Sequence, residues 1–182
     1  MNVKPGTYNL GPSDGTVRVK TGRQGMASKV CHDLTLEACN WKATLTVDGD
    51  PSRSEVNATV EPRSLEVTAA TGGAKPVSDK DKKDIKKNIS GLLGNGSITF
   101  TSTSVEVKND TSLKVPGELS ISGQSRPVTL DLTATPDGRL TGSLTLVQSQ
   151  FGIKPFSAMM GALKVKDEVE VNLDVALPAE SS

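Results

Sequence analysis

Apolar and polar side chains alternate with a period of two through most of the sequence. Between Val30 and Ala38, for example, apolar side chains such as Leu34 and Leu36 alternate with Asp33 and other polar ones. The same alternation recurs at residues 41–47, 55–61, 113–121, 128–134, 140–146 and 169–177. Successive side chains of a strand point to opposite faces, so each run predicts a strand with one apolar and one polar face.

These runs predict an antiparallel sheet that surrounds a single interior. Strands of a parallel sheet are buried on both faces and read as continuously apolar runs, which are missing from this sequence. We therefore expect an all-β domain over residues 1–182, a size that one domain commonly reaches. Its sheet is curled around, or doubled over, an aliphatic interior. Alternation does not indicate whether that interior is hollow or filled.

One segment has the periodicity of a helix. Acidic residues at its start and apolar residues at Ile85, Ile89 and Leu92 predict a short helix over about residues 79–93. We interpret the charged run 79–87 as the solvated face of a surface helix. The alternative is a lid, in which the three apolar side chains close the mouth of a barrel.

Charge and hydropathy exclude several classes of partner. The 21 basic residues equal the 21 acidic ones, so no basic surface is predicted for nucleic acid. No run approaches the roughly 20 apolar residues of a membrane span, so we expect no stable membrane insertion. The N-terminal segment lacks the pattern of a signal peptide. We expect a cytoplasmic protein, or a periplasmic or secreted one if a leader precedes Met1.

The cysteines agree with a reducing compartment. On a continuous strand the Cα atoms of Cys31 and Cys39 lie about 26 Å apart, whereas a disulfide needs about 7 Å or less. An internal bridge is excluded unless that strand folds back.

His32 is the single histidine and falls on an apolar strand face. A buried polar group needs a partner, so we interpret His32 as a core histidine paired with a neighbour or water. The alternative is a contact with a quinone oxygen or a polyprenyl head group. Cys31 and Asp33 point to the opposite face of the predicted strand, which leaves no adjacent catalytic dyad. No pair of cysteines or histidines has metal-ligand spacing, so we expect no metal and no cofactor.

Two aromatic or Met-bearing elements are candidates for the edge of a cavity. Trp41 is interpreted as a core residue, or else as the floor or rim of a cavity. The loop from Phe151 to Leu163 is unusually apolar, with Phe156 and a Met pair among Gly and Pro residues. This apolar character indicates packing under the loop, a flexible portal or a homodimer contact.

Several short segments follow one another in the order and spacing of a known family. They are Ile98–Ser102 (ITFTS), Val115–Leu119 (VPGEL), Gly123–Val128 (GQSRPV), Phe151–Ile153 (FGI) and the closing strand 169–177. In these segments the chain resembles the YceI-like family. The resemblance implies a lipocalin-like antiparallel β-barrel of about eight strands with one short helix. It also implies a non-enzymatic protein that binds a polyisoprenoid lipid or quinone.

The expected function is therefore binding, storage or transport of a long-chain isoprenoid lipid or quinone in an apolar cavity. The candidate wall and portal residues are His32, Leu34, Leu36, Trp41, Val56, Phe100, Leu119, Ile121, Leu130, Leu144, Phe151, Phe156, Met159 and Met160. One alternative is a packed-core scaffold that meets a protein through the helix and the Met-bearing loop. A less favoured one is an enzyme acting on an isoprenoid. The ends, residues 1–5 and 178–182, are expected to be flexible.

Overall fold

The computed structural model of the chain describes residues 4–177, which fold into one curled antiparallel sheet with one α-helix. The first half contains β1 (Gly6–Leu10), β2 (Gly15–Gln24), β3 (His32–Ala38), β4 (Trp41–Val47), β5 (Glu55–Val60), β6 (Leu65–Gly72) and α1 (Asp79–Leu93). The second half contains β7 (Ile98–Ser102), β8 (Glu106–Val107), β9 (Ser112–Ile121), β10 (Gln124–Ala134), β11 (Arg139–Val147), β12 (Ser157–Ala158) and β13 (Leu163–Ala176). The predicted flexibility of residues 1–5 and 178–182 concerns segments that lie almost wholly outside the described residues.

Alternation translates directly into burial along the strands. In β9, Leu113, Val115, Leu119 and Ile121 are buried, while Lys114 and its fellow polar residues lie on the other face. The predicted antiparallel sheet with an apolar inner face is confirmed, because every strand pairing among the described residues is antiparallel.

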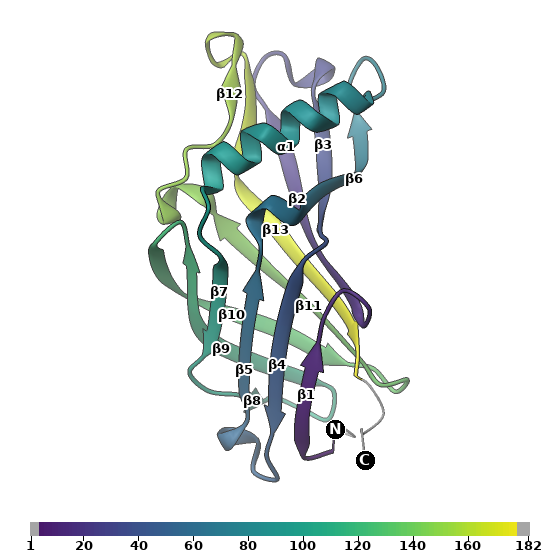
Figure 1. Cartoon of the computed structure of the whole chain (residues 1–182), viewed down its shortest axis with the longest axis vertical. Helices are drawn as coiled ribbons and strands as arrows, with labels where there is room; N and C mark the ends of the chain where they lie inside the picture. Colours follow the sequence, from purple (N-terminus) through teal and green to yellow (C-terminus); the bar gives the residue numbers. More distant parts are fainter. Residues whose placement is uncertain (1–3, 178–182) are drawn as a thin grey trace.

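The expected closed barrel of about eight strands is wrong. The sheet is an open path of eleven strands in the order β1-β4-β5-β7-β9-β10-β11-β13-β2-β3-β6, with β8 and β12 beside it. Its strong curl forms a half-barrel (Figure 1). The seven predicted runs do not include β1, β2 and β6, and alternation does not determine whether the two end strands of a sheet pair with each other.

A kinked hairpin links the two ends of this path. Residues 39–40 separate β3 from β4, and residues 61–64 separate β5 from β6. The Cys39 N–H donates to the Ser64 carbonyl at 3.1 Å, and the Glu61 N–H donates to the Asn40 carbonyl at 3.0 Å. Because β3 lies near one end of the path and β4 near the other, this hairpin makes the sheet curl around one interior.

The helix begins and ends at local signals that its sequence carries. The Ser78 hydroxyl accepts from the Asp81 N–H at 3.2 Å, and the Asp81 carboxylate accepts from the Ser78 N–H at 2.9 Å. This capping box satisfies two backbone N–H groups at the first turn. Gly94, with a φ of 71°, ends the helix. The observed range Asp79–Leu93 is the one that the sequence predicts. Figure 1 shows α1 running across the upper half of the curled sheet, in front of β2 and β3.

Apolar side chains gather in two core clusters along the inside of the sheet. One surrounds Phe100, Val115 and Phe151, and the other surrounds Leu36 and Trp41. Leu93 of α1 packs against both, which ties the helix to the interior. None of the helices within residues 4–177 has the length and apolar character of a membrane span.

A hollow aliphatic interior as the candidate ligand site

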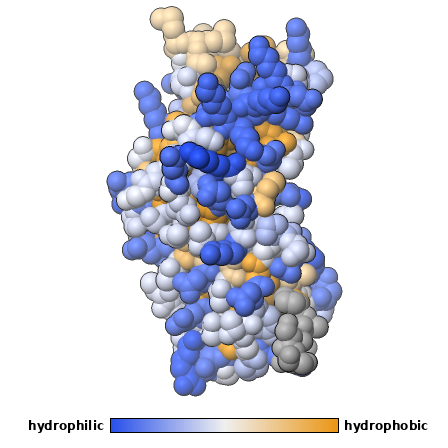
Figure 2. Space-filling model, viewed as in Figure 1, coloured by the Kyte–Doolittle hydropathy of each residue, from blue (hydrophilic) through white to orange (hydrophobic). Residues whose placement is uncertain are grey.

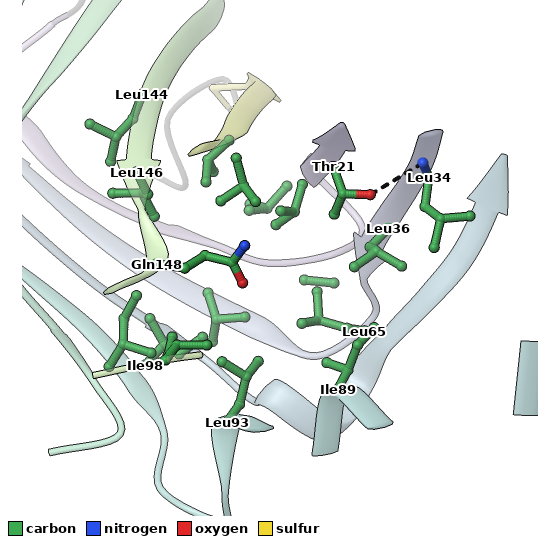
Figure 3. A pocket seen from close by; sticks show the side chains of 18 of the residues that line it. Thr21, Leu34, Leu36, Leu65, Ile89, Leu93, Ile98, Leu144, Leu146 and Gln148 are labelled. Carbon is green, nitrogen blue, oxygen red and sulfur yellow. Dashed lines mark hydrogen bonds between the residues drawn. The ribbon is translucent and has the colours of Figure 1, made fainter. Parts of the chain in front are cut away.

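The curled sheet encloses a cavity of about 530 Å³ between its inner face and α1. Proteins commonly bind small molecules in apolar cavities of roughly 300–1,000 Å³. Most of the side chains that line this cavity are leucine, valine, isoleucine and alanine. Figure 3 shows such side chains, among them Leu36, Leu65 and Leu144, converging from several strands. The interior is therefore hollow, which alternation alone could not establish.

A row of cross-strand neighbours explains part of the empty space. Ala43 on β4 pairs with Ala58 on β5, which pairs with Phe100 on β7, which pairs with Leu119 on β9. All four line the cavity. Two alanines side by side leave the interior open at β4 and β5, because side chains directly opposite each other project from the same face.

Gly117 lets the Phe100 ring lie against β9. A Cβ atom at this position would come within 2.5 Å of the Phe100 Cζ atom and of the Thr101 carbonyl oxygen. The glycine of the VPGEL segment thus has a packing role, since no larger residue fits without displacing the ring or the neighbouring strand.

The helix covers the cavity through its apolar edge. Ile85, Ile89, Leu92 and Leu93 line the cavity together with Asn88, and the lysines of α1 lie on its other side, exposed or half-buried. Both interpretations of this segment describe part of the arrangement: its charged face is solvated, and its apolar edge forms a wall of the cavity.

Most of the residues predicted from sequence line the cavity. They are His32, Leu34, Leu36, Trp41, Val56, Phe100, Leu119, Ile121, Leu130, Leu144 and Phe156. Three predicted wall or portal residues lie outside its lining. Phe151 is 2% exposed and fills the first core cluster, whereas Met159 and Met160 are exposed to solvent. Parity does not separate a packed core position from a cavity wall, and it does not apply to the loop that carries the methionines.

His32 has a hydrogen-bond partner from the protein, which agrees with its interpretation as a paired histidine, but it is not a buried core residue. Its Nε2 atom lies 2.7 Å from the Lys75 carbonyl oxygen, so Nε2 carries a proton and donates. Gly73 makes room for the ring, since a Cβ there would lie 2.2 Å from Nε2. The ring is half-buried and lines the cavity.

The placement of Cys31 on the opposite face is wrong. Residues Ser28–Val30 form a 3-10 helix and β3 begins only at His32, so strand parity does not govern Cys31. Its side chain is buried, lines the cavity and donates from Sγ to the Ala27 carbonyl at 3.0 Å. Both cysteines are free thiols.

Several polar residues that line the cavity are not among the wall and portal residues predicted from sequence. The Arg23 guanidinium donates to the Cys31 carbonyl at 2.6 Å and lies 3.5 Å from the Asp33 carboxylate. The Gln148 side chain, which extends among the aliphatic residues in Figure 3, donates to the Lys166 carbonyl at 2.9 Å. Thr21, Asn88 and Lys164 also line the cavity. The sequence does carry a signal for two of these residues. On β2, alternation places Thr21 and Arg23 on the same strand face as Val17 and Val19.

The two charged side chains in the described lining of the cavity are both basic. Among residues 4–177, the cavity is lined by Arg23, Lys164 and half-buried His32 but by no Asp or Glu. The described part of the chain also contains no group of three His, Cys, Asp or Glu side chains able to hold a metal ion.

Trp41 carries a polar atom that the fold leaves without a partner. Its ring is 5% exposed and lines the cavity, and within residues 4–177 its Nε1 atom has no hydrogen-bond partner. The alternatives of core residue and cavity wall are therefore both true of this ring, which also belongs to the second core cluster.

Comparison with solved structures places this fold among known ones. Burkholderia cenocepacia BcnA is similar with a TM-score of 0.67 and 16% sequence identity, over 88% of this chain and 94% of that chain. A mutant YceI protein of Campylobacter jejuni is similar with a TM-score of 0.51 and 16% identity, over 77% of this chain and 82% of that chain. At such identities the likeness concerns the fold.

Sequence comparison identifies the family. UPF0312 proteins of Shewanella baltica strains OS185 and OS195 are each 27% identical to this chain over 113 residues, which is 57% of this chain and 55% of theirs. The match thus spans about half the length of these curated relatives. The sequence model of the YceI-like domain matches residues 8–177, almost the whole chain. This chain therefore belongs to the YceI-like domain family.

Proposed function

We propose that the cavity binds the tail of a long-chain isoprenoid lipid or quinone, which the protein stores or carries without changing it chemically. The hollow aliphatic interior under α1 is the observation that carries this proposal. Membership of the YceI-like family supports it, because the family's members bind lipids of the isoprenoid kind.

The tail supplies most of the affinity in this proposal. Each CH₂ group transferred from water is worth about 0.8 kcal/mol, so one five-carbon isoprene unit contributes up to about 3–4 kcal/mol before ordering costs. A single hydrogen bond to a head group adds only about 1 kcal/mol net. Affinity should therefore rise with tail length until the cavity is full.

The head group lies at the polar end of the cavity in this proposal. Arg23, His32 and Lys164 come from adjoining strands there, since Arg23 and Val165 are register partners and Arg23 bonds the Cys31 carbonyl next to His32. The Arg23 and Lys164 side chains donate hydrogen bonds, so they suit a head group with oxygen acceptors, such as a quinone carbonyl. His32 already donates from Nε2 to the Lys75 carbonyl, so only its Nδ1 atom remains for a head group, and we assign His32 a part in orienting the ligand rather than in supplying affinity.

The packed-core scaffold is a weaker candidate. Its distinguishing feature is a filled interior, whereas this sheet surrounds a cavity of about 530 Å³.

Organic extraction and native mass spectrometry of the purified protein test the proposal. We expect a co-purified apolar lipid or, after delipidation, saturable binding of added prenols and prenyl quinones. Trp41 is the single tryptophan and lines the cavity, so its emission reports occupancy. If no lipid co-purifies and no added prenol or quinone changes that emission or the measured mass, the proposed function is wrong.

A further inference from the structure

Exposed apolar side chains cluster at one end of the molecule, on two loops that lie side by side. Met26 is 95% exposed, Val30 52%, Met159 68% and Met160 fully exposed. We name this set of four residues the methionine tip. Figure 2 shows apolar atoms at the upper end of the molecule, where the hairpin between β12 and β13 ends in Figure 1.

The two loops of the methionine tip are joined by their backbones. The Ala27 N–H donates to the Ala162 carbonyl at 2.9 Å. Gly25, with a φ of 99°, permits this approach, because a Cβ there would lie 2.5 Å from the same oxygen. The tip is therefore one surface, although Met26 and Met159 are far apart in sequence.

The backbone conformation directs this surface outward. Met159 and Met160 both have a positive φ, of 51° and 53°, and Gly161 follows with 88°. Residues with a Cβ rarely adopt this left-handed region. Apolar side chains that are exposed to water together at the end of a loop mark an interaction surface. Unbranched methionine adapts to irregular or fluid apolar partners.

Charge indicates what the methionine tip meets. The segments 24–32 and 148–166 contain Lys29, Lys154, Lys164 and Lys166 but no Asp or Glu. The acids that follow them directly, Asp33 and Asp167, contact Arg23 and Ser149. All four lysines are exposed. Helix α1, which crosses the same half of the molecule in Figure 1, has five lysines against three aspartates, and one of these lysines, Lys86, pairs with Glu66. Apolar side chains flanked by lysines complement an anionic lipid surface. The apolar side chains enter the interface, and the lysines face the head groups.

The methionine tip also adjoins the cavity. Val30 belongs to the tip and lines the cavity, and Phe156 and Leu163 line it from the hairpin that carries Met159 and Met160. Because a tail that enters beside Val30 would remain among apolar side chains, the tip provides a route between a bilayer and the cavity. We infer that the methionine tip docks on an anionic bilayer to load or release the cavity's lipid, an inference that rests on the proposed function.

Vesicle flotation of the full chain tests this docking. The probes are vesicles of phosphatidylcholine alone and of phosphatidylcholine mixed with phosphatidylglycerol. We expect binding to the mixed vesicles to be at least about tenfold stronger at low salt, since each lysine near an anionic surface contributes about fivefold, and to weaken as salt screens the charges.

The double substitution Met159→Asn and Met160→Asn removes the apolar side chains while retaining a residue type that tolerates a positive φ. We expect it to weaken vesicle binding by about tenfold or more, because burying a methionine side chain is worth at least about tenfold in a partition constant. Val107→Ser is the matched control. Val107 is a 44% exposed apolar residue on β8, away from the tip, and its substitution should leave vesicle binding unchanged.

Farnesol binding, followed by Trp41 emission, separates this inference from the proposed function. Docking is supported if the wild type and the double variant both bind farnesol and the variant binds vesicles more weakly. Farnesol binding without any vesicle binding by the wild type, or equal vesicle binding by both proteins, overturns docking alone. Vesicle binding without binding of farnesol or of any longer prenol or prenyl quinone supports the docking surface and refutes the cavity function. A wild-type dimer that the double substitution dissociates would assign the tip to a second copy of the chain and overturn docking.

Discussion

Substitution of Ala58 by phenylalanine should shorten the ligand that the cavity accepts. Ala58 lies on the cavity wall between Ala43 and Phe100, beside the first core cluster, so the new ring projects into the cavity. The added phenyl ring has roughly the bulk of one isoprene unit. A ligand that fills the cavity must therefore withdraw about one unit into water.

The cost follows from the apolar surface that is no longer buried. One isoprene unit contributes up to about 3–4 kcal/mol, so a cavity-filling prenol should bind Ala58→Phe between about tenfold and several hundredfold more weakly than the wild type. The lower figure applies where the tail finds another path inside the cavity. A prenol one unit shorter should lose much less, because it already leaves space unused.

Calorimetric titration with farnesol and geranylgeraniol measures this difference directly. In the wild type we expect the longer prenol to bind more tightly, and in Ala58→Phe we expect that advantage to shrink. Asn57→Phe is the matched control, since Asn57 is the preceding residue of β5 and is exposed on the other face. Equal effects of the two substitutions, or unchanged affinities in Ala58→Phe, would refute the reasoning that the tail occupies this cavity.

Three further predictions concern the cavity residue His32, the core residue Phe151 and the helix-cap residue Asp81. Substituting His32 by alanine should change prenol affinity by less than about fivefold, because one hydrogen bond is worth about 1 kcal/mol and this ring is already bonded to Lys75; a hundredfold loss in calorimetry would assign it a larger role. Phe151→Ala should lower the free energy of unfolding by about 3–5 kcal/mol in urea titrations, since Phe151 is a fully buried core residue; a loss below about 1 kcal/mol would contradict its place in the core. Hydrogen bonds from the Ser78 hydroxyl and N–H lower the pKa of Asp81. The ionised carboxylate therefore stabilises the folded chain at pH values above its ordinary pKa near 4, and this stabilisation is lost as the pH falls through the folded-state pKa. The difference in melting temperature between wild type and Asp81→Asn should shrink on acidification, and a constant difference across that range would exclude this titration.

Local patterns predict the helix, the composition of the wall and seven of the eleven strands on the sheet path. Side chains of a strand alternate faces whatever the rest of the chain does, so Leu34, Leu119 and Leu130 could be placed on the inner wall from sequence. The cap at Ser78 and the stop at Gly94 are equally local. Where the backbone leaves the strand, as at Cys31, the same rule fails.

Residue patterns along the chain predict an antiparallel sheet with an aliphatic inner face and one amphipathic helix without reference to any distant contact. The folded structure shows three features that these patterns leave open: the sheet is an open path of eleven strands, Phe151 fills the core, and a cavity remains under α1. It also joined Met26 to Met159 and Met160 in one exposed surface through the contact of Ala27 with Ala162. The physical reason is that alternation depends on neighbouring residues, whereas closure, empty volume and contact between loops depend on how distant strands pair and curl.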